Sequence, residues 1–194
     1  MTKLTALCVY CGAHLGIHPS HRTAAARLGT LLGKNRIKLI FGAGSVGLMG
    51  VVADAALAAG GEAIGIIPHH LNRAELAHDR LTEIHVVDSM HERKQRMFEL
   101  ADAFAVIPGG LGTLDETIEI ITWRQLGLHQ MPVVLIDHQG YWKPFCKLVD
   151  HVIREGFAHS SVKNMYTIVS GVEDVISTID SRPQEEIPAK LDLQ

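Results

Sequence analysis

The chain has 194 residues and a formal net charge of -3 at pH 7, with 18 lysines and arginines set against 21 acidic residues. It therefore lacks the excess positive charge expected of a protein that binds nucleic acid or an anionic membrane surface. No apolar run approaches the ~20 residues of a membrane span, and its three cysteines show no disulfide framework. We expect a soluble, cytoplasmic protein with neither a nucleic acid nor a membrane as partner.

Short apolar runs alternate with helical patterns along almost the whole chain. The expected strands are Leu4–Tyr10, Lys38–Phe41, Ala63–Ile67, Glu83–Val87, Ala103–Ile107, Val133–Ile136 and Tyr166–Val169. The expected helices lie near Ser20–Gly33, Leu48–Ala59, Met90–Leu100, Leu114–Leu126, Tyr141–Glu155 and Val172–Ile179. This alternation predicts an α/β fold, a Rossmann-like, doubly wound parallel sheet, in a single domain over residues 1–180. A polar tail follows over residues 181–194.

The loops after the strands matter most, because ligands of such sheets bind beyond the carboxyl ends of the strands. The strongest signal is Pro108–Glu116, PGGLGTLDE, which follows an apolar strand and opens a helix. Glycines let the backbone approach a ligand closely, and a helix start attracts an anion. The segment predicts a phosphate site that needs no lysine. In the alternative interpretation, Thr113 and Glu116 form a capping box and the glycines only make the turn.

A second glycine-rich turn, Gly42–Gly50, has the spacing G-x-G-x-x-G after an expected strand. A dinucleotide site would also need an acidic residue about 20 positions later, at the end of the next strand. Glu62 instead precedes that strand, so the pattern favours a mononucleotide pocket over one for NAD or FAD. A third turn, Cys11–His14, ends the first strand at the same edge of the sheet.

The helix that begins near Ser89 carries Arg93 and Lys94, and Ser89 with Glu92 has the spacing of a capping box. A solvated surface arginine is the ordinary interpretation of Arg93. Alternatively, the first turn of this helix lies across the pocket, and the planar guanidinium binds a phosphate or a ribose. We find no metal-binding motif and no cofactor lysine, and we expect neither a metal nor a cofactor.

Taken together, these segments resemble the LONELY GUY family of cytokinin-activating phosphoribohydrolases, often labelled possible lysine decarboxylases. The resemblance rests on the Cys-Gly turn after the first strand and on the segments at 44–50, 90–94, 108–116 and 121–127. It implies a homodimeric enzyme that cleaves the base–ribose bond of an N6-substituted adenosine 5′-monophosphate, or of AMP. The products would be the free base and ribose 5-phosphate.

The same resemblance implies that Arg93 and Glu116 are the catalytic pair, with the 5′-phosphate on Gly110–Thr113. The implied substrate-binding residues are Glu75, Arg93, Lys94, Gly109, Gly110, Leu111, Gly112, Thr113, Leu114, Asp115, Glu116 and Thr122. The chain departs from the family pattern at His14, Phe41 and Ala43, where serine, tyrosine and glycine are usual. These departures bear on base preference and substrate fit.

Two other functions remain open at this point. One is a noncatalytic nucleotide or molybdenum-cofactor carrier of related fold, which needs the phosphate turn but not both Arg93 and Glu116. The other, lysine decarboxylation, requires pyridoxal phosphate and ranks last. For the homodimer, the helix that carries Ile118, Ile120, Ile121 and Trp123 would either contribute to the interface or face the core.

Overall fold

The computed structural model describes residues 4–72 and 77–181, and in this part of the chain seven parallel strands form one sheet. The strand order is β4-β3-β2-β1-β5-β6-β7. The strands are β1 (Ala6–Tyr10), β2 (Lys38–Phe41), β3 (Ala63–Pro68), β4 (Glu83–Val87), β5 (Ala103–Val106), β6 (Val133–Ile136) and β7 (Thr167–Val169). The predicted parallel α/β sheet is therefore confirmed. The tail predicted at 181–194 lies, apart from its first residue, outside the described residues.

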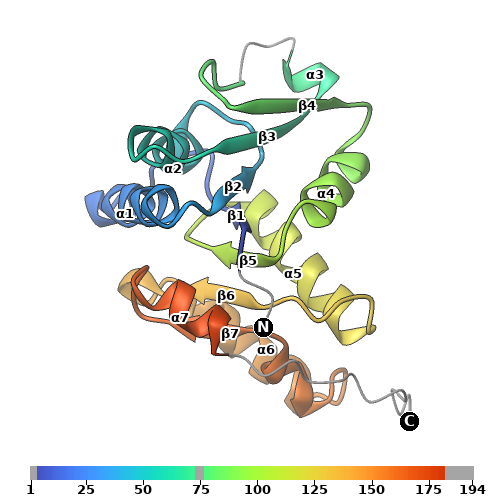
Figure 1. Ribbon diagram of the computed structural model, residues 1–194. Coiled ribbons are helices and arrows are strands. Elements are labelled where there is room, and N and C mark those ends of the chain that lie inside the picture. Colours follow the sequence, from blue (N-terminus) through green and yellow to red (C-terminus); the bar gives the residue numbers. More distant parts are fainter. Residues whose placement is uncertain (1–3, 73–76, 182–194) are drawn as a thin grey trace.

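Helices cover both faces of this sheet. They are α1 (Pro19–Asn35), α2 (Gly47–Ala58), α3 (His69–Asn72), α4 (Met90–Glu99), α5 (Leu111–Gln125), α6 (Lys143–Arg154) and α7 (Asp174–Asp180). Apolar side chains of α1, α2 and α7 form one core cluster, and those of α4 and α5 form another on the opposite face, joined by Phe145 of α6. Figure 1 shows α1 and α2 on the left of the sheet and α4 and α5 on the right.

The longer elements were predictable because each has a clear apolar pattern, and their ends differ from the prediction by a few residues. The largest shift at a helix start is in α5, which begins at Leu111 rather than Leu114. The short helix α3 and two 3₁₀ helices, η1 (His138–Gly140) and η2 (Ser160–Met165), were not predicted. These segments are too short to show a helical period in the sequence.

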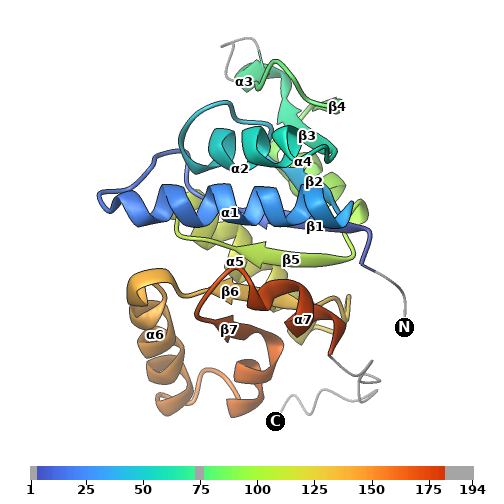
Figure 2. The same cartoon turned by 60° about the vertical axis from the view of Figure 1, so that its left-hand side comes forward.

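The helices α1 and α2 pack backbone against backbone through small residues. They lie side by side in both cartoon views (Figures 1 and 2). A Cβ atom on Gly29 would lie 2.2 Å from the carbonyl oxygen of Val52, and one on Gly33 would lie 2.6 Å from that of Ala56. This close contact fixes α2, and with it the glycine-rich turn that precedes α2, against the sheet.

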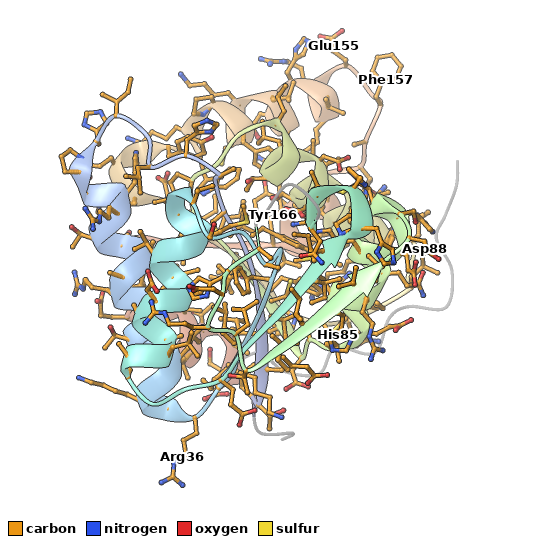
Figure 3. The ribbon with its side chains drawn as sticks, turned by 90° about the horizontal axis from the view of Figure 1, so that it is seen from above. Arg36, His85, Asp88, Glu155, Phe157 and Tyr166 are labelled. Atoms are coloured by element: carbon orange, nitrogen blue, oxygen red, sulfur yellow. The ribbon has the colours of Figure 1, made fainter. Side chains whose placement is uncertain are left out.

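The strand order reverses at β1, which has β2 on one side and β5 on the other. The helices that follow β2 and β5 cover opposite faces of the sheet. Such a switch point opens a crevice at the carboxyl ends of the strands. Figure 3 labels a residue at each end of the strands: Arg36 projects just before β2 begins, and Asp88 lies just beyond the end of β4. The loops expected to bind a ligand lie at the same end of the strands as Asp88.

Candidate active site

The three turns predicted to share one edge of the sheet are in direct contact. The backbone N–H of Gly12 donates to the carbonyl of Pro108 at 3.1 Å, and that of Leu48 donates to the carbonyl of Gly12 at 2.9 Å. Gly47 has a φ of 63°, and a Cβ atom there would lie 2.2 Å from the carbonyl carbon of Ala13. Glycine is required at this position by both the backbone conformation and the space.

The start of α5 does not have the geometry of a capping box. Gly110 is the N-cap residue, and no side chain caps the helix. Thr113 lies inside the first turn, so the capping-box interpretation of Thr113 and Glu116 is wrong. The first N–H groups of a helix have no partner within the helix, which leaves those of Leu111, Gly112 and Thr113 available to a bound anion. Tyr141, which the sequence did not single out, donates from its hydroxyl to the carbonyl of Gly109.

Arg93 is a buried residue, so the surface interpretation is wrong. The helix that carries Arg93 is capped by Ser89 as predicted, because the Ser89 hydroxyl accepts a hydrogen bond from the Glu92 N–H at 3.1 Å. Only 9% of Arg93 is exposed. Its Nε donates to the carbonyl of Ile66 at 3.1 Å, and Nη2 donates to that of Gly42 at 3.2 Å. The ends of β2 and β3 thus fix the guanidinium.

Glu116 lies beside Arg93. Its Oε1 lies 3.6 Å from Nη1 of Arg93, and both side chains are nearly buried. Burial raises the pKa of Glu116 to about 7, although the Arg93 guanidinium opposes this rise. A carboxyl group with this pKa exchanges its proton at neutral pH, which is the property required of a general acid or base.

Lys94 is held by two carboxylates of α5. Its Nζ lies 2.9 Å from Oε1 of Glu119 and 3.3 Å from Oδ2 of Asp115. Partial burial lowers the pKa of Lys94, but hydrogen bonds to Glu119 and Asp115 outweigh it and raise the pKa above its ordinary value. Lys94 is therefore a positioned cation. Sequence reasoning missed Glu119 because its contact joins α4 to α5 and leaves no local pattern.

The remaining predicted residues are spread around α5. Leu111 and Gly112 are exposed beside the helix start, and Leu114 packs against the core. Thr122 is exposed a further turn along, where its hydroxyl donates to the carbonyl of Ile118. Glu75 lies outside the described residues. The structure thus brings Arg93, Lys94, Asp115 and Glu116 together beside the glycine turn, and leaves Thr122 farther along the same helix.

The position of Arg93 depends on the absence of a side chain at Gly42. A Cβ atom there would lie 1.7 Å from Nη2 of Arg93 and 2.9 Å from its Cζ. We expect Gly42→Ala to displace the guanidinium and to lower kcat/KM by about 10- to 100-fold, because the resemblance implies that Arg93 is catalytic and small misplacements of a catalytic group are costly. The thermal unfolding temperature should also fall, because the displaced guanidinium no longer donates to the buried carbonyls of Ile66 and Gly42. Steady-state kinetics at the wild-type rate would show that Arg93 need not be held in this place.

Comparison with known proteins identifies the family of the chain. Residues 49–179 match the family described as possible lysine decarboxylase. A cytokinin riboside 5′-monophosphate phosphoribohydrolase from Rhodococcoides fascians is 39% identical over 174 residues, 89% of this chain and 88% of the relative. One from Arabidopsis thaliana is 37% identical over 192 residues, 98% of this chain and 88% of the relative.

Solved structures show the same fold at lower identity. The molybdenum cofactor binding protein from Rippkaea orientalis has a TM-score of 0.68 and 24% identity, and the match covers 93% of this chain and 98% of that chain. The molybdenum cofactor carrier protein from Chlamydomonas reinhardtii has a TM-score of 0.69 and 18% identity, with coverage of 92% and 97%. These likenesses concern the fold alone. The relatives at higher identity share nearly the whole chain, and the chain belongs to the LONELY GUY family of phosphoribohydrolases.

Proposed function

We propose that the chain hydrolyses the N-glycosidic bond of adenosine 5′-monophosphates, with N6-substituted ones as the preferred substrates and AMP as a further substrate. The observation that carries the proposal is the buried pair Arg93 and Glu116 beside the uncapped start of α5. Relatives named cytokinin riboside 5′-monophosphate phosphoribohydrolase, 36–39% identical to this chain, support the same reaction. A carrier protein would need the phosphate turn but has no chemical use for both buried side chains.

In the proposed reaction the 5′-phosphate binds the N–H groups at the start of α5, which places the ribose beside Glu116. As the bond from C1′ to the base breaks, positive charge develops on the ribose, and the Glu116 carboxylate stabilises it. Glu116 also accepts a proton from the water that adds to C1′. The base leaves with the bonding electron pair and takes up a proton from solvent, and Glu116 then returns its proton to solvent. Arg93 holds the substrate in place, so that binding energy becomes orientation.

Lysine decarboxylation is not supported by the surroundings of Lys94. A lysine that forms a Schiff base must lose its proton, and enzymes lower the pKa of such lysines to make this possible. The two carboxylates beside Lys94 raise its pKa instead. In our proposal Lys94 stays protonated and contributes positive charge to the substrate site.

The reaction is tested by supplying purified protein with adenosine, AMP, ATP and an N6-substituted AMP, and by measuring the free base. We expect the monophosphates to react fastest, because the start of α5 offers room and donors for one compact anion. Turnover of the bare nucleoside at the same rate as the monophosphate would contradict the proposed role of this helix start.

The footprint of the phosphate is tested at Gly112. A Cβ atom at this position would meet no described protein atom within 4 Å, so only a ligand would be disturbed. We expect Gly112→Ala to raise KM for the monophosphate about tenfold or more. It should also stabilise the fold by up to about 0.5–1 kcal/mol, because alanine favours a helix over glycine. Gly110→Ala has similar open space and serves as a second variant; unchanged KM in both would place the phosphate elsewhere.

We further infer a homodimer in the cytoplasm. Ile120 and Ile121 are buried in the core, whereas Ile118 is 48% exposed on the same helix and is available to a second copy. The cysteines are free, consistent with a reducing compartment. No helix in the described part of the chain is long and apolar enough to cross a membrane. Sedimentation at micromolar concentration tests the dimer, and a single species of 21.2 kDa would contradict it.

A further inference from the structure

The segment that leads into β4 is attached to the glycine-rich turn after β2. The backbone N–H of His78 donates to the carbonyl of Ala43 at 2.8 Å. Beside this hydrogen bond, Ala77 and Gly44 form an isolated antiparallel bridge. The short pairing fixes the Ala43 carbonyl from outside the turn.

The Ala43 carbonyl needs such a partner because Ala43 has an unusual backbone conformation. Its φ is 60°, in the left-handed region that a residue with a Cβ atom adopts only at an energetic cost. If Ala43 relaxed to an ordinary φ, the peptide group between Gly42 and Ala43 would rotate. The Gly42 carbonyl would then leave Nη2 of Arg93, which donates to it at 3.2 Å. The hydrogen bond from His78 opposes this rotation, because it holds the next carbonyl along the chain.

The imidazole ring of His78 is itself held at both nitrogens. Only 4% of this side chain is exposed. Its Nδ1 accepts from the backbone N–H of Arg80 at 3.2 Å, so the ring proton is on Nε2. Nε2 donates to Oδ1 of Asp54 at 3.1 Å. Asp54 belongs to α2, which packs closely against α1, and the ring therefore joins the segment before β4 to a fixed helix.

Arg80 contacts the same carboxylate from a different setting. Its Nη2 donates to Oδ1 of Asp54, but 67% of the Arg80 side chain is exposed. Ion pairs at such exposed positions contribute little to stability. Asp54 thus has two partners, a buried ring next to the turn and an exposed guanidinium, and substitutions can separate their effects.

We propose that His78 is a positioning residue for Arg93, and that Asp54 holds the His78 ring in place. His78 does not touch the reacting atoms. It keeps the Gly42 carbonyl where it accepts from Arg93, and so helps to keep the guanidinium beside Glu116. The effect of His78 on turnover rests on the proposed function, whereas its effect on the guanidinium does not.

The link is tested without substrate by hydrogen exchange at the Nε–H of Arg93, which NMR detects and which Arg93→Ala assigns by its absence. His78→Asn and Asp54→Ala should each accelerate this exchange about tenfold or more, because the guanidinium is released more often. Asp54 is an exposed helix position, so Asp54→Ala should fold even if His78→Asn does not. Arg80→Gln removes only the exposed contact and is the matched control, which should exchange as the wild type does. The indole N–H of Trp142, 1% exposed in the other core cluster, is the reference for a general loss of stability.

A double-mutant cycle measures the consequence for turnover. In the wild-type background, His78→Asn and Asp54→Ala should each lower kcat/KM about tenfold, because a small displacement of Arg93 is costly. In the Arg93→Ala background the same substitutions should have no further effect, because the residue through which His78 acts is gone. A merely structural role for His78 would lower kcat/KM by the same factor in both backgrounds.

Three results would overturn the proposal: the same exchange rate at Arg93 in the wild type and both variants, equal acceleration at Arg93 and Trp142, or equal losses of kcat/KM in the two backgrounds. If the wild type hydrolyses no nucleotide but His78→Asn or Asp54→Ala still accelerates exchange at Arg93 alone, His78 positions the guanidinium and the proposed function is wrong.

Discussion

Glu116→Gln is expected to lower kcat by about 100-fold or more while leaving the fold and the binding of the monophosphate largely intact. Glutamine has nearly the shape of glutamate, but it carries no negative charge to stabilise the developing cation and accepts no proton from water. The variant is measured by release of free base and, separately, by calorimetric titration with AMP.

The control is Glu119→Gln, one turn along α5, which removes a carboxylate from Lys94 rather than from Arg93. We expect this control to affect KM more than kcat, because in the proposed function Lys94 binds substrate and does not react with it. If Glu116→Gln folds and hydrolyses the monophosphate near the wild-type rate, Glu116 has no catalytic role.

The raised pKa of Glu116 gives this variant a signature in pH. Because the proposed mechanism uses the carboxylate, kcat/KM of the wild type should rise with pH through about 7, and the residual activity of Glu116→Gln should lack this rise. The effect of pH on stability has the opposite sign. Because the folded state binds the Glu116 proton more tightly than the unfolded state does, this proton stabilises the fold fully below the ordinary pKa of 4.5, and the stabilisation is lost as pH rises through about 7. Glutamine is uncharged, as the protonated Glu116 side chain is, and it does not titrate.

We therefore expect Glu116→Gln to become more stable relative to the wild type by roughly 1–3 kcal/mol as pH rises from about 5 to 8. Urea unfolding of both proteins at the two pH values measures the difference. A difference that does not depend on pH would show that Glu116 titrates in its ordinary range. Together, the kinetic and stability results separate a carboxyl group used in the reaction from one that only supports α5.

The sheet and the location of the site were predictable because their causes are local. Continuous apolar strands such as Val133–Ile136 lie between helices in the sequence, and the turns follow directly from strand to helix. Parallel strands bring all of their carboxyl ends to one edge, so the contact of Gly12 with Pro108 follows from the order of elements. The place of the glycine-rich turn Pro108–Glu116 at this end of the strands was predictable for the same reason.

The surroundings of each side chain were not predictable in the same way. The sequence favoured a surface position for Arg93 over a position in the pocket, because the burial of Arg93 depends on the carbonyls of Ile66 and Gly42, which are distant in the sequence. Lys94 and Glu119 meet between two helices, and Tyr141 reaches Gly109 from beyond β6. Contacts of this kind are set by packing in three dimensions, for which one sequence has no periodic signal.

Arg93→Ala is expected to lower both activity and stability, for two separable reasons. The activity should fall by about 100-fold or more, because the substrate loses a fixed donor fork and Glu116 loses its buried counter-charge. The fold should lose about 1–3 kcal/mol, because the carbonyls of Ile66 and Gly42 lose their donor in a buried place. Denaturant unfolding and steady-state kinetics at a temperature where the variant is fully folded measure the two effects.

Chemical rescue distinguishes the two roles of Arg93. Millimolar guanidinium added to Arg93→Ala should enter the space left by the side chain and restore part of kcat/KM, whereas an ammonium salt at equal ionic strength should not, since only the planar group reproduces the fork of donors. Arg93→Lys tests the same point within the chain, because it keeps the charge without the fork, and it should remain well below the wild-type rate. If the folded Arg93→Ala protein works at nearly the wild-type rate, Arg93 serves only to join the ends of β2 and β3, and the substrate must be held by other residues.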